Sequence, residues 1–154
     1  MTNVYDIIKT VKDFLRANPS VNTVTFGDIT QVNLNKTEMF PLTHFILGNA
    51  QMMEHNVRIT LSFLFLDIVD YSKEHNADDS GYRQDDSNLV DVYNTQLQVA
   101  NALISDLRRG DLYRDEYQLV GEPTCEPFKD RFENELAGWS VDVTIDVRNN
   151  LSVC

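Results

Sequence analysis

The chain has 154 residues, 42% of them hydrophobic and 24% charged, a composition typical of a single globular domain and unlike that of fibrous or disordered proteins. Its formal net charge of −11 argues against a protein that grips nucleic-acid phosphates or binds an anionic membrane surface. Its two cysteines, Cys125 and Cys154, are too few for a disulfide framework or a zinc site, so we expect free thiols. The sequence therefore predicts one domain over residues 1–154.

The N-terminal region predicts a helix followed by a β-hairpin. The helix begins after Thr2 or Asn3, stops at Asn18-Pro19, and carries apolar residues at helical spacing: Val4, Ile7, Ile8, Val11, Phe14 and Leu15. Charges interrupt these apolar positions, so we expect no signal peptide and a protein that stays in the cytoplasm unless it leaves inside an assembly. Residues 21–26 and 29–34 alternate on either side of Gly27-Asp28, which predicts the hairpin.

The longest apolar run, VRITLSFLFLDIVD from Val57 to Asp70, predicts a central strand. Its first face is apolar at period two, and the second half is apolar on both faces, so each face needs a cover there. Residues 39–47, with Pro41 at the strand start, predict an arm that forms a second hairpin with this strand. Residues 138–148 alternate from Trp139 onward and predict a half-buried partner strand.

Residues 71–86 form a long polar segment, which predicts an exposed loop. A helix follows from Ser87 to Arg109, with Gly110 suited to a left-handed C-cap. Its predicted buried stripe consists of Leu89, Tyr93, Leu97, Ala100, Ile104 and Leu107, flanked by Val92 and Leu103. We expect this helix to cover the second face of the central strand. Residues 113–120 then predict a strand, and residues 121–130 an irregular link.

Together these elements predict an α+β fold. Because strands adjacent in sequence usually pair antiparallel, we expect a mostly antiparallel sheet of about five to six strands with two main helices packed on it.

Candidate chemistry is sparse. Part of the acidic loop matches an EF-hand calcium loop at its first positions, Asn76, Asp78, Ser80 and Gly81, but Ser87 replaces the bidentate Glu at the last one. His44, His55 and His75 lie in separate segments, and His44 fits a sheet-face histidine better than a metal ligand. Cys125 has no nearby His in the sequence to activate it. We assign no catalytic, cofactor-binding or metal residue and expect no cofactor and no enzymatic activity.

Several short motifs resemble those of head-tail joining proteins of tailed bacteriophages. They are Phe40-Pro41-Leu42-Thr43-His44, a long strand ending near Asp67, a loop and helix, Pro127-Phe128, and Ala137-Gly138-Trp139 before an alternating strand and the terminal Cys154. The order of elements resembles that of the tail-terminator or tail-completion fold.

This resemblance implies a virion protein that forms a six-fold or twelve-fold ring in the neck or tail, after assembly in the host cytoplasm. Its partners would be further copies of itself, the portal or adaptor, and tail proteins, with no membrane; DNA would pass through the lumen without sequence-specific binding. Within such a ring we expect the acidic loop to contact a neighbouring subunit through Asp78, Asp79, Asp85 and Asp86. The alternative is a small ligand- or calcium-binding module that uses loop 71–86.

Overall fold

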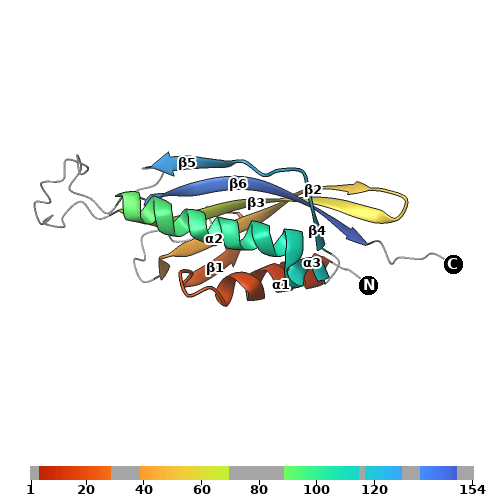
Figure 1. Ribbon diagram of the computed structural model, residues 1–154, viewed down its shortest axis with the longest axis horizontal. Coiled ribbons are helices and arrows are strands. Elements are labelled where there is room, and N and C mark those ends of the chain that lie inside the picture. Colours follow the sequence, from red (N-terminus) through yellow and green to blue (C-terminus); the bar gives the residue numbers. More distant parts are fainter. Residues whose placement is uncertain (1–3, 29–38, 70–88, 115–116, 130–135, 149–154) are drawn as a thin grey trace, which may run out of the picture.

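The computed structural model describes residues 4–28, 39–69, 89–114, 117–129 and 136–148. Three helices and six strands occur in these ranges (Figure 1). In chain order they are α1 (Val4–Arg16), β1 (Thr23–Phe26), β2 (Leu42–Met52), β3 (Asn56–Ile68), α2 (Leu89–Arg109), α3 (Asp111–Arg114), β4 (Tyr117–Val120), β5 (Cys125–Lys129) and β6 (Leu136–Arg148). The predicted α+β class is confirmed.

One sheet joins all six strands in the order β1-β2-β3-β6-β4, with β5 also on β6. The predicted pairing of the central strand with the Trp139 strand is confirmed, because β3 and β6 pair antiparallel from Asn56↔Arg148 to Ile68↔Leu136. The hairpin of β2 with β3 is confirmed as well. By contrast, β1 pairs with β2 in parallel. The second arm of the predicted N-terminal hairpin, residues 29–34, lies outside the described residues.

The main core lies between one face of the sheet and the helices. The predicted apolar face of the central strand is confirmed, with Ile59, Leu61, Phe63 and Phe65 all buried against residues of α1 and α2. A row of rings, Phe26, Phe45 and Phe63, crosses three strands at centroid distances of 5.0 and 5.4 Å. We expected α2 on the second face of β3, which is wrong, because α2 packs on the first face, where the apolar stripe is longest.

The opposite, helix-free face of the sheet has a smaller apolar cluster at one end only. It consists of Phe40, Leu42, Leu66, Phe128 and Leu136, with Leu64 and Ile68 packed at its margin. The apolar second half of β3 thus finds its cover in neighbouring strands and in Phe40. The peptide bond between Phe40 and Pro41 is cis, and β2 begins immediately after it.

Helix α2 ends at Arg109 as predicted, while the predicted start at Ser87 lies outside the described residues, and its buried stripe differs in part from the prediction. Its buried residues are Val92, Gln96, Val99, Ala100, Leu103 and Leu107, whereas Leu97 is 41% exposed. The prediction is confirmed for Ala100 and Leu107 and for the flanking Val92 and Leu103. It is wrong for Leu97, which it placed toward the core, where the structure has Gln96.

The C-terminal end of α2 also differs from the prediction. Gly110 does not adopt a positive φ, and its N–H donates to the carbonyl of Asp106 at 2.8 Å. The Asp106 carboxylate accepts a second bond, from the N–H of Leu112 at 2.9 Å, so the chain turns directly into α3. A Cβ at Gly110 would lie 2.9 Å from the Cα of Asp106 and would also meet its carboxylate, so close approach of Asp106, and not a left-handed cap, favours glycine here.

Two C-terminal assignments need correction. Tyr113 lies in α3, so only the second half of the predicted strand over residues 113–120 is a strand. Residues 125–129 of the predicted irregular link form β5, which pairs with β6. β5 contains Pro127 but is an edge strand, where proline is tolerated because one side of the ladder needs no donor.

The sheet divides into two halves along its strands. A row of the sheet is the set of residues that lie opposite one another on neighbouring strands. In the closed half, β1 and β5 lie at the two ends of the same rows. One such row consists of Phe26, Phe45, Phe63, Val141 and Cys125. In the open half, the outermost strands are the rest of β2, residues 46–52, and β4. This half includes the β2–β3 hairpin, which extends past the C-terminal end of α2 (Figure 1).

Candidate functional site

The predicted interface residues Asp78, Asp79, Asp85 and Asp86 lie outside the described residues, as does the calcium-like segment from Asn76. Their role stays a prediction. The described residues instead direct attention to the helix-free face and to the outer edges of the sheet.

A hollow of about 470 Å³ lies on the helix-free face near the middle of the sheet. It is lined by Asp28, His44, Ile46, Ser62, Phe63, Leu64, Ser140 and Asp142. Ile46 is 40% exposed beside it, and Ser62 donates a hydrogen bond to Asp142 at 2.6 Å. The hollow therefore joins an apolar floor to a rim that includes two carboxylates.

His44 is held in one orientation at the edge of this hollow and is only 2% exposed. Its Nε2 lies 2.6 Å from the carbonyl oxygen of Gly27, which can only accept, so Nε2 carries a proton. Nδ1 lies 2.7 Å from Thr25 Oγ1 and accepts from that hydroxyl in the neutral ring. Burial lowers the pKa of His44, against smaller opposing effects of the Gly27 carbonyl and the Asp28 charge. Since both ring nitrogens are engaged, His44 ties β1 to β2, as expected for a sheet-face histidine.

A polar ladder continues the helix-free face through the open half. Arg58 donates from Nε and Nη2 to the two carboxylate oxygens of Asp146, at 2.8 and 3.0 Å, and this bond raises the pKa of Arg58. In the next polar row, Thr60 and Thr144 share a hydrogen bond of 3.2 Å. Each of these side chains is thus bonded across the β3–β6 pair, an arrangement that stabilises the sheet.

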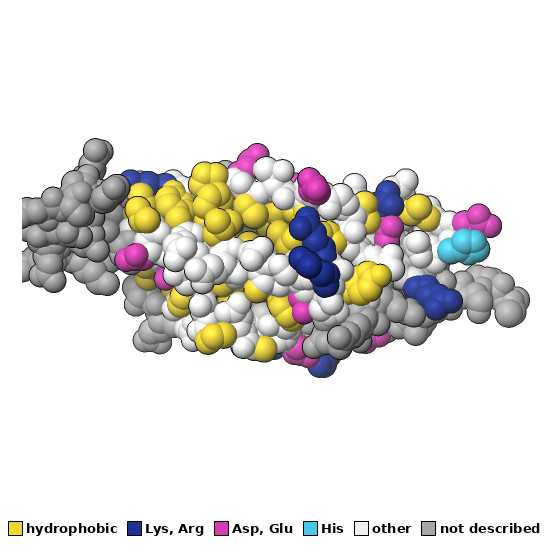
Figure 2. Space-filling model, viewed as in Figure 1, with side chains coloured by type: hydrophobic (Ala, Val, Ile, Leu, Met, Phe, Trp, Pro, Cys, Tyr) yellow, Lys and Arg dark blue, Asp and Glu magenta, His cyan; other side chains and the backbone are white. Residues whose placement is uncertain are grey.

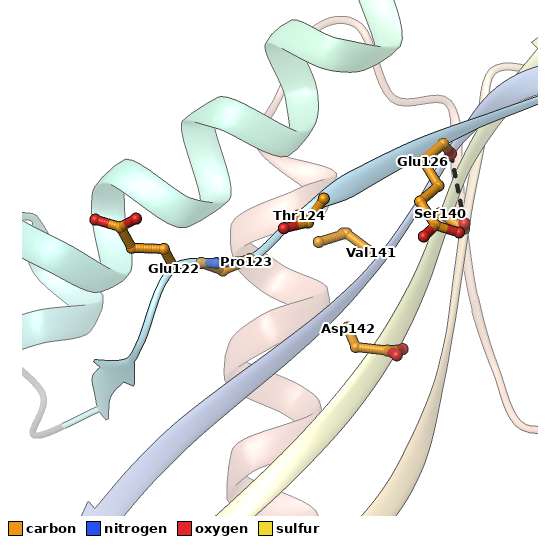
Figure 3. A pocket seen from close by; sticks show the side chains of 7 residues that line it. All are labelled: Glu122, Pro123, Thr124, Glu126, Ser140, Val141 and Asp142. Atoms are coloured by element: carbon orange, nitrogen blue, oxygen red, sulfur yellow. Dashed lines mark hydrogen bonds between the residues drawn. The ribbon is translucent and has the colours of Figure 1, made fainter.

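A second, acidic hollow of about 280 Å³ lies beside β5 and β6 (Figure 3). Its carboxylates belong to Glu122, Glu126 and Asp142, and in Figure 3 they are spread along the strands without converging on one point. The Ser140 hydroxyl donates to the Glu126 carbonyl at 3.4 Å. Within the described ranges, no group of three or more His, Cys, Asp or Glu side chains could hold a metal ion.

Two further titratable groups are partly buried. Burial raises the pKa of the Cys125 thiol, which therefore favours its protonated, unreactive form. Burial also raises the pKa of Asp67, although the Ile68 N–H donates to its carboxylate at 2.7 Å and opposes this effect. The two lie in different rows of the sheet, Cys125 opposite Val141 and Asp67 opposite Ala137, so they do not form a catalytic pair.

Large exposed hydrophobic side chains gather along the β1–β2 edge. They are Phe26, Ile46, Leu47, Met52 and Met53, with Met52 74% exposed. Residues 39–53 contain no Asp, Glu, Lys or Arg, although charged residues make up 24% of the chain. No described strand pairs with the outer edge of β2 beyond Phe45. Sequence reasoning missed this edge as a site, although the fifteen-residue stretch without a charge could have indicated it.

The side of the sheet that carries the helices exposes hydrophobic and cationic side chains. A strip of hydrophobic side chains runs between α2 and β5, and cationic side chains lie over the C-terminal end of α2, where Arg108 and Arg109 end the helix (Figure 2). None of the described helices is long and apolar enough to span a membrane.

Comparison with protein-family models gives no match, and comparison with curated protein sequences gives none either.

Proposed function

We propose that this protein is a structural virion component that assembles into a ring in the neck of a tailed phage, or at the head-proximal end of its tail. The ring joins the portal or adaptor to the tail proteins and surrounds the channel through which DNA passes. It works by assembly and has no turnover of its own.

The main support is the outer edge of β2 in the open half. Natural edge strands are usually protected by charges, prolines or a covering element, because unpaired backbone N–H and C=O groups invite another strand. Residues 46–52 have none of these charges or prolines, and their burial pattern is exposed throughout. A chain that carries such an edge is suited to being covered by a neighbouring subunit.

The charge of the chain supports the same proposal. A subunit with a net charge of −11, repeated around a ring, lines a channel with negative potential that repels DNA phosphates and lets the duplex slide. On the helix-free face, carboxylates of Glu126 and Asp142 lie at the two hollows described above.

The test is an assembly experiment. The purified protein, alone and mixed with a phage portal from the same genome neighbourhood, is measured by mass photometry and negative-stain electron microscopy. Closed rings, free or seated on the portal, are the expected result. A protein that stays monomeric in both samples at all concentrations overturns the proposal.

The acidic loop provides a second test of the ring. Replacing Asp78, Asp79, Asp85 and Asp86 with Lys should leave the circular dichroism spectrum native and reduce incorporation into particles. If the quadruple variant assembles like wild type, the loop is not an interface. The alternative of a calcium-binding module at loop 71–86 stays a prediction, and calcium titration calorimetry checks it.

A further inference from the structure

The two outer edges of the open half lie at the same level in the sheet. Gln51 of β2 is opposite Arg58, Arg58 is opposite Asp146, and Asp146 is opposite Gln118 of β4. The same register places two further pairs in shared rows: Ala50 with Leu119, and Met52 with Tyr117. A second copy placed beside the first at the same height therefore brings β4 next to β2 without a shift along the strands.

The strand directions also match. β2 is antiparallel to β3, β3 to β6, and β6 to β4, so β2 and β4 run in opposite directions. Rotation about an axis roughly along the strands preserves the direction of every strand. In a ring generated by such a rotation, β4 of one copy is antiparallel to β2 of the next, which is the pairing that exposed edges form most readily.

The chemistry of the two edges is compatible. Residues 46–53 and 117–120 contain no Asp, Glu, Lys or Arg, so these segments can approach without like-charge repulsion in a strongly acidic protein. The β5 edge of the closed half differs, because it carries Glu126, Pro127 and Lys129, which are typical protections against strand addition.

We infer that the β4 edge of one copy pairs with the β2 edge of the next, with Gln118 opposite Gln51. The occupant of the open β2 edge is thus a second copy of this chain. This inference rests on the ring proposed above and names its subunit contact. The contact is heterologous, since each copy uses a different surface toward each neighbour, as a closed cyclic ring requires.

Disulfide trapping tests the contact. The variant Gln51→Cys/Gln118→Cys is made in a background of Cys125→Ser and Cys154→Ser, so that only the new thiols can oxidise. Directly opposite residues of an antiparallel pair have Cα atoms about 4.5 to 5.5 Å apart, which suits a disulfide. Under oxidation, a non-reducing gel should show a ladder of covalent multimers that ends at the ring size. Each single-cysteine variant should remain monomeric on the gel.

A matched control moves one thiol to the closed half. Glu126 is exposed on β5 and shares its row with His44 rather than with Gln51, so Gln51→Cys/Glu126→Cys should give no ladder. Dimers from Gln51→Cys alone would overturn the inference in favour of a two-fold β2–β2 contact.

The outcomes separate this contact from the ring itself. Rings seen by electron microscopy, together with a double variant that stays monomeric under oxidation, overturn the contact and leave the ring standing. A ladder that grows without closed particles supports the contact and overturns the ring. Failure of both the wild-type protein to form rings and the double variant to form a ladder overturns both.

Discussion

The closed and open halves of the sheet differ in how their outer strand edges are covered. In the closed half, β1 covers β2 on one side and β5, with its proline and charges, ends the sheet on the other. Trp139 also links β6 to α2 there, because its Nε1–H donates to the Tyr93 carbonyl at 2.9 Å and its ring contacts the Tyr93 ring edge to face. The open half has a polar ladder within the sheet, uncharged outer strands and a projecting hairpin.

If the open edges bind neighbouring copies, as we propose, then stability and assembly depend on different halves of the sheet. Substitutions in the closed half should change the free energy of unfolding of one copy. Substitutions on the open edges should change contacts between copies and leave the monomer nearly unaffected.

Phe128→Ala in the closed half should lower the free energy of unfolding by about 3 to 5 kcal/mol, because it removes a ring that is 6% exposed and leaves a cavity beside Leu66 and Leu136. The matched change in the open half is Met52→Ala, whose side chain is 74% exposed and whose loss should cost less than about 0.5 kcal/mol. Urea denaturation of both variants measures the comparison. Equal losses would remove the distinction between the halves.

Gln96→Met should stabilise the protein by about 1 to 2 kcal/mol. Gln96 is fully buried one turn after Tyr93, and within the described part of the chain neither Nε2 nor Oε1 of its side-chain amide has a hydrogen-bond partner. Methionine has a similar volume and no polar group that needs a partner. The control is Gln98→Met on the exposed side of the same helix, which should leave the melting temperature unchanged. A lower melting temperature for Gln96→Met would show that the amide has a stabilising role.

His44 should make the closed half sensitive to acid. Its pKa in the fold is lowered by burial, so just below the ordinary histidine pKa of 6.5 the unfolded chain binds a proton that the folded chain does not. The free energy of unfolding therefore falls as the pH drops through 6.5, by at most about 1.4 kcal/mol per pH unit for this one proton. His44→Gln should remove that part of the dependence in denaturation curves between pH 7 and 5.

The control for this pH effect is His55→Gln, which deletes an exposed histidine at the hairpin turn without touching Thr25 or Gly27. This variant should keep the acid sensitivity of the wild type. Parallel curves for the wild type and His44→Gln would contradict the assignment.

Ala50→Lys should have the smallest effect on the monomer, within about 0.5 kcal/mol, because Ala50 is exposed in the open half. Its new charge lies on the edge that we assign to the next copy, so ring formation in mass photometry should fall sharply. Glu126→Lys on the protected β5 edge is the matched control and should assemble as the wild type does. Normal assembly of Ala50→Lys would argue that β2 remains uncovered in the ring.

Local sequence patterns predicted correctly the strands and helices in which burial of one side appears as a regular spacing of apolar residues. The alternation in Val57–Asp70 and in residues 138–148 identified β3, β6 and their shared core face correctly. Helical spacing located both main helices. These successes have one physical cause, since burial on one side of an element imposes its period on the sequence.

Other features depend on residues far away in the chain. The parallel pairing of β1 with β2, and the place of β5 at an edge that tolerates Pro127, follow from the order of strands in the sheet, which local patterns do not encode. The buried stripe of α2 was predicted only in part, because Gln96 is polar yet buried. The uncharged stretch over residues 39–53 is visible in the sequence, but its place at an open edge follows only once the outermost strands are known.

The register between β2 and β3 shifts by one residue between Leu47 and Ala50, and this β-bulge has a consequence for how the hairpin can change in evolution. Leu47 is opposite Leu61 and Ala50 is opposite Ile59, so Gly48 and Asn49 share the single position opposite Thr60. A Cβ on Gly48 would lie 2.9 Å from the Thr60 carbonyl oxygen, which explains the glycine. Odd-numbered residues face the helices before the bulge and even-numbered ones after it. Deletion of Gly48 would therefore remove the bulge and leave all the remaining β2–β3 pairs in place. A related protein that lacks this one residue would have the same hairpin.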